Sequence, residues 1–324
     1  MDLVIAWCSF SEERMKKISD WKERLGIIEN DGNNPQRYQD HNELKYALRS
    51  IEKNLSGVTR VILVTDNERP EWLVKDTDFL KVVDHKEIIP KEYLPTFNSD
   101  VIEAFLYNIP GLSENFLYAN DDMFVSQPLD VATYFFNAEG KPIYRVFPHT
   151  SEEILKARDY GLHLILNYKL INNLYGKRYK YKPSHGIDAY NKTAFKNIVE
   201  NSRLAPFIKD GLKHKFRESH SVGRPGISLA MVAEGKMELR VMPVKKPAGF
   251  SFSKIKRAVD KLFNRGKYKK VIYLAEINNF EAYRLMRKWP QFCINDNLNA
   301  GAIHYRFFEY KLNEWFPKKS KYEK

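Results

Sequence analysis

The stretch LPTFNSDVIEAFLYNIPGLSENFLYANDDMF, residues 94–124, decides the fold of this chain. Residues 98–100, Asn-Ser-Asp, supply side chains that cap helices, and they precede a predicted helix at 100–108. The apolar run at 115–120 predicts a buried strand that leads directly into Asp121-Asp122. Two adjacent carboxylates at a strand end are a common way to place a metal ion, and through it a nucleotide diphosphate, at the edge of an α/β sheet.

Apolar runs upstream of this stretch predict further strands, and helical patterns lie between them. The strands are expected at 2–7, 58–67 and 79–85, and the helices at 12–25 and 41–54. This alternation favours an α/β fold with a mainly parallel sheet. Active residues then belong at the carboxyl ends of the strands, where the chain has Trp7, Thr65-Asp66 and Asp121-Asp122.

The second half of the chain is less regular. Helices are expected at 151–175, 193–200, 204–214 and the end of 216–235, followed by a basic amphipathic helix at 253–270. For the helix at 253–270, a position on the anionic inner face of the plasma membrane is one interpretation, and a solvated basic helix or a helix packed on the core is equally supported.

Charge divides the chain into an acidic and a basic half. The net charge is +12, but residues 1–150 carry 17 Lys and Arg against 25 Asp and Glu, whereas residues 151–324 carry 36 against 16. This division suits a metal–nucleotide site that faces a phosphate-rich acceptor. It suits equally an acidic sheet domain that carries a basic part facing a membrane or a nucleic acid.

Several classes of protein find no support in the sequence. No run of about 18 apolar residues predicts a transmembrane helix, and the N-terminus reads as a first strand rather than a signal peptide. The two cysteines, Cys8 and Cys293, form neither a disulfide framework nor a zinc motif, so a reducing cytoplasm is the simplest location. The sequence has no G-x-S-x-G, P-loop or G-x-G-x-x-G motif.

Basic and polar residues of the second half are candidates for phosphate chemistry. His185, in PSHGID, can exchange a proton near neutral pH, although a single histidine in a loop is more often only exposed. Arg217 and Arg224, in KFRESHSVGRPG, can bind phosphate with two hydrogen bonds each, and a solvated basic loop is the alternative. Asp296, in CINDN, fits a metal or acceptor contact or an Asx-turn.

The first half also has candidates with ordinary alternatives. Asp121-Asp122 alone is more often a turn or a helix cap than a metal site, and the apolar strand before it favours the site. Arg49 and Asp66 are further candidates for the part of the site that the first half of the chain forms. For Arg49, a surface salt bridge is the alternative.

Four regions of the chain, in order, resemble the conserved regions of the Stealth proteins. MDLVIAW matches the first region up to its tryptophan, and Cys8-Ser9-Phe10 then departs from the acidic or amide residue and the glycine expected there. The second region is matched nearly throughout by NELKYALRSI, ILVTDN-x-x-P-x-WL, VDH-x-x-I-x-P, LPTFNS-x-x-IE and IPGLSE-x-F-x-Y-x-NDDMF. PSHGID and KFR resemble the third region, and FCINDN resembles the fourth. Stealth proteins are sugar-1-phosphate transferases of bacterial capsule synthesis, related to the animal N-acetylglucosamine-1-phosphotransferase.

The resemblance implies that an acceptor hydroxyl attacks the β-phosphorus of a nucleotide-diphosphate sugar. The sugar-1-phosphate is transferred and a nucleoside monophosphate leaves, a reaction that depends mostly on positioning and charge stabilisation. Mg²⁺ or Mn²⁺ at Asp121 and Asp122 is the implied cofactor, and a glycan or lipid-linked glycan is the implied acceptor. The expected catalytic residues are His185, Arg217, Asp121 and Asp122; the donor-binding residues are Trp7, Arg49, Asp66, Asn98, Glu103 and Asn120; the acceptor or phosphate contacts are Arg224, Asn295 and Asp296.

The expected fold is therefore α/β of the GT-A or Rossmann-like kind, with a mainly parallel sheet flanked by helices and a helical, basic C-terminal part. Residues 1–150 are expected to form a nucleotide-sugar-binding core, and residues 151–250 to complete the site. Residues 251–324 are expected to form a basic helical segment that returns to the site near 292–299.

Two other functions compete with sugar-phosphate transfer. A GT-A glycosyltransferase would share the sheet and the aspartate pair, but would break the glycosidic bond at carbon and release a nucleoside diphosphate. A basic nucleic-acid-binding protein is supported by the +20 balance of residues 151–324, with its interleaved tyrosines, and is opposed by the acidic first half.

Overall fold

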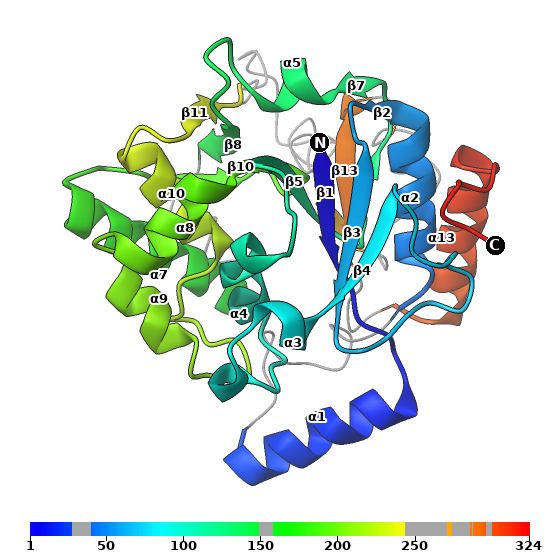
Figure 1. Ribbon diagram of the computed structural model, residues 1–324, viewed down its shortest axis with the longest axis horizontal. Coiled ribbons are helices and arrows are strands. Elements are labelled where there is room, and N and C mark those ends of the chain that lie inside the picture. The colour runs from blue at the N-terminus through cyan, green and yellow to red at the C-terminus, as the bar shows by residue number, and fades with distance from the viewer. Residues whose placement is uncertain (28–39, 149–157, 244–270, 274–285, 287, 296–299) are drawn as a thin grey trace, which may run out of the picture.

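The computed structural model describes residues 1–27, 40–148, 158–243, 271–273, 286, 288–295 and 300–324 (Figure 1). The predicted helix at 253–270, the start of the predicted helix at 151–175 and Asp296 lie outside these residues. No helix within the described part of the chain combines the length and the apolar character needed to cross a bilayer.

A five-stranded sheet forms the centre of the molecule. Its strands lie in the order β10-β5-β1-β3-β4, in which four are parallel and β10 is antiparallel. The parallel strands are β1 (Asp2–Ala6), β3 (Arg60–Thr65), β4 (Leu80–Asp84) and β5 (Asn115–Asn120), and β10 is Asp188–Asn191. The predicted α/β fold with a mainly parallel sheet is confirmed.

Helices cover both faces of this sheet because its strands alternate their apolar side chains. Val4 packs in a core with α4, α7, α8 and α10, whereas Leu3 and Ile5 pack in a second core with α2. Figure 1 shows these two layers on either side of the sheet. The longer helices are α1 (Glu12–Leu25), α2 (Glu43–Asn54), α7 (Arg158–Tyr175), α8 (Lys192–Asn201), α10 (Arg224–Ala233) and α13 (Ala302–Trp315); the shorter ones include α3 (His85–Ile88), α4 (Ser99–Ala104), α5 (Val131–Phe135) and α9 (Ala205–Gly211).

Small sheets extend the core on both sides. β13 (Gln291–Asn295) pairs with β6 (Met123–Val125), which follows the aspartate pair, and with β12 (Val271–Tyr273). A separate aromatic core packs α13 against α2, β6 and β13. The remaining strands are β2 (Leu55–Ser56), β7 (Leu129–Asp130), β8 (Ile143–Pro148), β9 (Tyr181–Pro183) and β11 (Glu238–Val241).

Two predicted helices differ from those observed. The predicted helix at 100–108 ends as an α-helix at Ala104 and continues as a 3₁₀ turn over Leu106–Asn108. The predicted helix at 204–214 ends at Gly211, so the polar residues after it form a loop instead.

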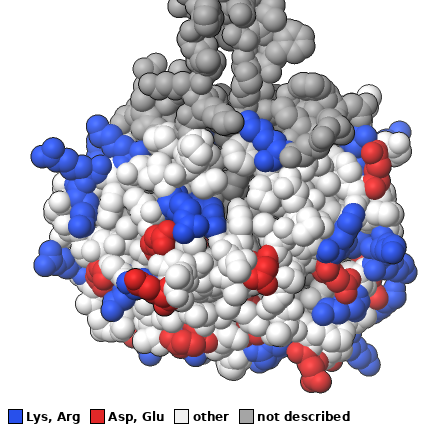
Figure 2. Space-filling view, turned by 90° about the horizontal axis from the view of Figure 1, so that it is seen from above, with Lys and Arg blue, Asp and Glu red and all other residues white. Residues whose placement is uncertain are grey.

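The carboxyl ends of the four parallel strands point toward α1, away from the N-terminus (Figure 1). The opposite face carries basic and acidic side chains interspersed in its described part, without a large patch of one sign (Figure 2). In open α/β sheets, ligands bind outside the carboxyl ends of the strands. A ligand-binding site is therefore expected at the edge of the sheet near α1.

Candidate active site

Four carboxylates gather where β5 ends, and we call this group the carboxylate corner: Asp40, Glu43, Asp121 and Asp122. Asp121 and Asp122 form the turn between β5 and β6, and Glu43 begins α2. Asp40 accepts a 3.0 Å hydrogen bond from the indole nitrogen of Trp7, which directly follows β1. The ends of two neighbouring strands and the start of one helix thus build the corner.

The carboxylates of the corner repel one another, with Glu43 buried and Asp40, Asp121 and Asp122 partly buried. Burial raises the pKa of Asp121 well above its ordinary value, and the negative charges of Asp122 and Asp40 raise it further. Burial likewise raises the pKa of Glu43, and Asp121 adds to that effect. The corner therefore places several negative charges close together, which a bound cation would stabilise. Its oxygen donors are of the kind that hard divalent cations take.

β13 connects the corner to the turn that carries His185. The thiol of Cys293 lies 3.0 Å from Asp122 Oδ2. At the start of the same strand, the side-chain oxygen of Gln291 accepts a 2.8 Å hydrogen bond from the backbone N–H of Ile187, two residues after His185. One short strand therefore contacts both halves of the candidate site.

His185 lies in a tight turn before β10. Its φ of 51° falls in the left-handed region, which residues other than glycine seldom adopt. A Cβ at the following residue, Gly186, would lie 2.8 Å from Gln291 Oε1, so a side chain at this position would have to displace the amide of Gln291. The side chain of Gln291 thus fixes the turn through both Gly186 and Ile187.

The register of the sheet brings this turn toward the corner. β10 pairs with β5 so that Asp188 lies opposite Tyr118 and Ala189 opposite Leu117. If the same antiparallel register continued, His185 would lie opposite Asp121. On the other side of β5, Asn120 pairs with Ala6 at the end of β1.

Asn98 fastens a second loop to this edge of the sheet. Its side-chain oxygen caps α4 by accepting a 3.0 Å hydrogen bond from the N–H of Asp100. Its side-chain nitrogen donates to the carbonyls of His214 and Phe216 at 3.3 and 3.4 Å. The loop between α9 and α10 is thereby held against the start of α4.

Arg217 lies on that loop and turns toward α4. Its guanidinium donates a hydrogen bond to the Ser99 hydroxyl, and its Nε lies 3.4 Å from Asp100 Oδ1. Its side chain is partly exposed, so it is not fully enclosed by these partners. The helix that precedes a parallel strand has its N-terminus at the carboxyl edge of the sheet, which places Arg217 at this edge.

Two expected site residues instead belong to a buried charge cluster, which we define as Glu103, Asp188 and Arg224. Arg224 donates a hydrogen bond to Asp188 and lies 3.5 Å from Glu103, and Glu103 accepts a 3.2 Å hydrogen bond from the Tyr118 hydroxyl. The guanidinium also lies 4.8 Å from the centre of the Tyr118 ring. These contacts join β10, α4 and α10 inside the protein, so Glu103 and Arg224 both have partners within the fold.

Arg49 was expected to bind the donor, and the structure gives it a different position. Its guanidinium forms two hydrogen bonds with Glu323, at 2.8 and 2.7 Å, and a third with the carbonyl of Phe316. These bonds anchor the C-terminal end of the chain to α2. The hydrogen-bonding atoms of Arg49 are thus engaged within the protein, as in the salt bridge that was the alternative for this residue.

Asp66 lies at the carboxyl edge, as its position after β3 predicts, but it is paired with α1. It accepts hydrogen bonds from Lys17 at 2.8 Å and Arg14 at 3.2 Å. Burial acts to raise the pKa of Asp66, but the hydrogen bond and charge of Lys17 outweigh it and the pKa is lowered. Asp66 therefore holds α1 against the sheet.

The remaining expected residue in the described part is Asn295, at the end of β13. Its side-chain oxygen lies 2.9 Å from the Cys293 thiol, which is itself next to Asp122. Asn295 thus lies beside the carboxylate corner.

Sequence reasoning missed four residues that shape this edge: Asp40, Glu43, Gln291 and Cys293. Glu43 had a usable signal, because it begins the helix whose motif matches the family. Gln291 had none, because its role depends on a contact between residues 104 positions apart in the chain.

Comparisons with known proteins agree with this architecture. The family description "Stealth protein CR2, conserved region 2" matches residues 37–143. The capsular polysaccharide phosphotransferase fcs1 of Haemophilus influenzae is 30% identical over 331 residues, which cover 98% of this chain and 84% of the relative. The capsular polysaccharide phosphotransferase LcbA of Neisseria meningitidis is 48% identical over 146 residues, which cover 43% of this chain and 38% of the relative.

Among solved structures, the glycosyltransferase GlyE of Streptococcus pneumoniae is 12% identical, with a TM-score of 0.39, over 100% of this chain and 65% of that one. A structural similarity at this level does not assign a function to the chain. The match to the Haemophilus influenzae protein extends over most of both chains, and the conserved region contains the carboxylate corner. The chain belongs to the Stealth family of capsular polysaccharide phosphotransferases.

Proposed function

We propose that this chain transfers a sugar-1-phosphate from a nucleotide-diphosphate sugar to a hydroxyl of a glycan or lipid-linked glycan in capsule synthesis. The acceptor oxygen forms a bond to the β-phosphorus of the donor. The bond from that phosphorus to the bridging oxygen breaks, and a nucleoside monophosphate leaves. The product is a phosphodiester.

The observation that carries this proposal is the bridge made by β13. Cys293 lies against Asp122, and Gln291 hydrogen-bonds the backbone two residues after His185, which supports a common site for an acidic group and a histidine. Transfer of a phosphoryl group from a diphosphate to a hydroxyl needs a proton acceptor for the hydroxyl and charge neutralisation for the departing phosphate. This pairing supports phosphoryl transfer better than it supports simple binding.

His185 is proposed to take the proton of the acceptor hydroxyl. The fixed turn limits the positions that the imidazole can adopt, which favours a defined approach to the acceptor. Arg217 is proposed to stabilise the negative charge of the transferred phosphate, because a guanidinium matches two phosphate oxygens. Asn98 is a positioning residue, since it holds the loop of Arg217 without needing to contact the substrate.

Asp121 and Asp122 are proposed to hold Mg²⁺ or Mn²⁺. The excess negative charge of the corner fits such a cation, and Mg²⁺ usually completes its coordination with water and phosphate oxygens. When bound, the cation would neutralise charge on the donor diphosphate. Trp7 is proposed to set the shape of this subsite through its hydrogen bond to Asp40, and Asn120 and Asn295 lie next to it.

The test is to incubate the protein with a panel of nucleotide sugars, Mg²⁺ and a capsule-type acceptor, and to identify the released nucleotide by mass. Release of a nucleoside monophosphate, coupled to gain of a phosphodiester in the acceptor, is the expected result. Release of a nucleoside diphosphate would instead identify a glycosyltransferase. Hydrolysis without transfer to any acceptor would overturn the proposal.

A further inference from the structure

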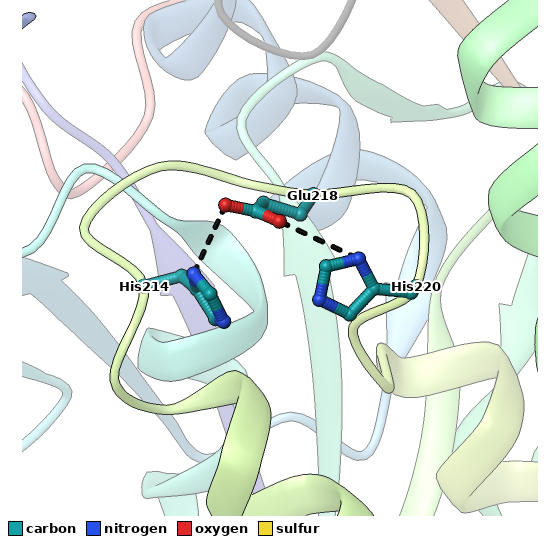
Figure 3. Close-up of side chains that lie close together, drawn as sticks. All are labelled: His214, Glu218 and His220. Atoms are coloured by element: carbon teal, nitrogen blue, oxygen red, sulfur yellow. Dashed lines mark ion pairs between the residues drawn. The ribbon is translucent and has the colours of Figure 1, made fainter. Parts of the chain in front are cut away.

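Away from the carboxylate corner, three metal-ligating side chains converge on the loop between α9 and α10. His214, Glu218 and His220 bring their ligand atoms within 4.8 Å of one another (Figure 3). His214 Nδ1 lies 3.0 Å from Glu218 Oε1, and His220 Nδ1 lies 3.4 Å from Glu218 Oε2. Figure 3 shows the carboxylate between the two imidazole rings.

These separations suit a single ion of the zinc type. Zinc binds nitrogen and oxygen ligands at about 2.0–2.2 Å, and a tetrahedral arrangement then separates neighbouring ligand atoms by about 3.3 Å. The two observed separations, 3.0 Å to Glu218 Oε1 and 3.4 Å to Glu218 Oε2, are near that value, and the three ligand atoms lie within 4.8 Å of one another, so modest side-chain rotation would bring them around one ion. Two imidazoles and one carboxylate are also a donor set that zinc takes readily, with water in the fourth position.

The backbone that carries these ligands is fixed on both sides. Asn98 holds the carbonyl of His214, and the N–H of Phe97 donates a 2.8 Å hydrogen bond to the carbonyl of Lys215. On the far side, the Ser221 hydroxyl lies 2.7 Å from the carbonyl of Glu218. Side chains on a fixed backbone lose less conformational entropy when they bind an ion together, so the site is partly preorganised.

We propose that His214, Glu218 and His220 form a binding site for a divalent transition-metal ion of the zinc class. The His220 side chain is 55% exposed, so the site is open to solution and the ion can exchange. Its nitrogen ligands distinguish it from the all-oxygen carboxylate corner, which suits harder cations. The two sites should therefore select different metals.

A bound ion would affect the position of Arg217, because Arg217 lies between His214 and Glu218 in the sequence. The loop from His214 to His220 is the segment that presents the Arg217 guanidinium to Ser99 and Asp100. An ion bound across this loop would restrict its motion and hold Arg217 in place. This consequence rests on the proposed function, whereas metal binding does not.

Zinc binding can be measured on tag-free, full-length protein after treatment with a chelator. Competition with a chromophoric chelator gives the affinity, and metal analysis after gel filtration gives the stoichiometry. The wild type is expected to bind one Zn²⁺ at this loop and to melt at a higher temperature with Zn²⁺ present. His214→Ala and His220→Ala should each weaken binding at least about tenfold.

His304→Ala is the matched control, because it removes a histidine on α13, far from the loop in sequence. It should bind Zn²⁺ like the wild type. A zinc ion held instead by the corner would persist in His220→Ala and be displaced by excess Mg²⁺. Absence of Zn²⁺ binding in the wild type, or unchanged binding in both loop variants, would overturn the site.

Transfer assays separate the two proposals. If His214→Ala loses Zn²⁺ and also slows transfer, with Glu218→Gln showing the same coupled losses, the link to Arg217 is supported. If Zn²⁺ binding is lost and transfer is unchanged, the site stands and its link to Arg217 is wrong. If no form transfers sugar phosphate, the proposed function fails while the result on Zn²⁺ remains.

Discussion

The carboxylate corner and the buried charge cluster both bring several ionisable groups together, yet they balance charge in different ways. In the cluster, the guanidinium of Arg224 lies between Asp188 and Glu103, and a tyrosine hydroxyl supplies a further hydrogen bond. In the corner, the described neighbours of Asp121 that shift its pKa most are Asp122 and Asp40, two more carboxylates. The cluster pairs its carboxylates with a guanidinium, whereas the corner places several carboxylates beside one another.

This difference separates residues that build the fold from residues that bind a ligand. A buried charge with an internal partner is stabilised before any substrate arrives. Buried like charges lower stability and persist where a ligand supplies the missing charge. By this criterion we expect Arg224, Glu103 and Arg49 to contribute mainly to the fold, and we propose that Asp121 and Asp122 bind a ligand. Each prediction below tests one side of this division.

Arg224→Met should have the largest effect, on stability. Removing the guanidinium leaves the carboxylates of Asp188 and Glu103 buried beside each other, which is expected to cost about 3–5 kcal/mol of unfolding free energy. Urea denaturation measures this cost. Glu103→Gln keeps the pair of Arg224 with Asp188 and should cost less.

Arg240→Met is the control for that measurement. Arg240 pairs with Glu238 at the surface, where an ion pair contributes at most about 1 kcal/mol. If Arg224→Met were no less stable than Arg240→Met, the cluster would not be architectural.

Asp122→Asn should have the next largest effect, on activity. Loss of one carboxylate from the corner is expected to reduce transfer by about a hundredfold or more, or about 2.7 kcal/mol, with the fold retained. Turnover and circular dichroism should be measured on the same sample. A folded variant with near-normal turnover would remove Asp122 from the site.

Two controls sharpen this result. Asp20→Asn removes an exposed aspartate that pairs with Lys16, and it should leave turnover unchanged. Arg49→Lys loses the two-bond geometry with Glu323, so it should lower stability while transfer persists. A selective loss of donor binding in Arg49→Lys would reinstate the donor-binding role that the structure argues against.

Local sequence was sufficient for the sheet and for the aspartate pair, because both depend on short-range patterns. The apolar run at 115–120 and its terminal carboxylates predicted the end of β5 directly. The partners of Arg49 and Arg224 were not predictable, because they come from residues 274 and 36 positions away. The sequence alone does not distinguish an arginine that pairs with a carboxylate of the protein from an arginine that binds an anionic substrate.

Asp121→Asn should have the smallest effect, an increase in stability in the absence of divalent cations. The pKa of Asp121 is raised in the folded protein, so ionisation of this group is penalised there. The protonated form therefore contributes its whole stabilisation below the ordinary carboxyl pKa of about 4. This contribution is lost as the pH rises through the raised pKa of the folded protein. At pH 8 the variant should therefore be more stable than the wild type by about 1 kcal/mol.

The pH and cation dependence of this difference make the test specific to charge. Lowering the pH toward 4 should shrink the difference between the two proteins, because the wild-type carboxyl group then binds a proton. Adding Mg²⁺ at pH 8 should raise the melting temperature of the wild type more than that of Asp121→Asn, since the cation replaces the missing counter-charge. If the variant were less stable than the wild type at pH 8 without cations, Asp121 would have an internal partner after all, and the corner would belong with the cluster as part of the architecture.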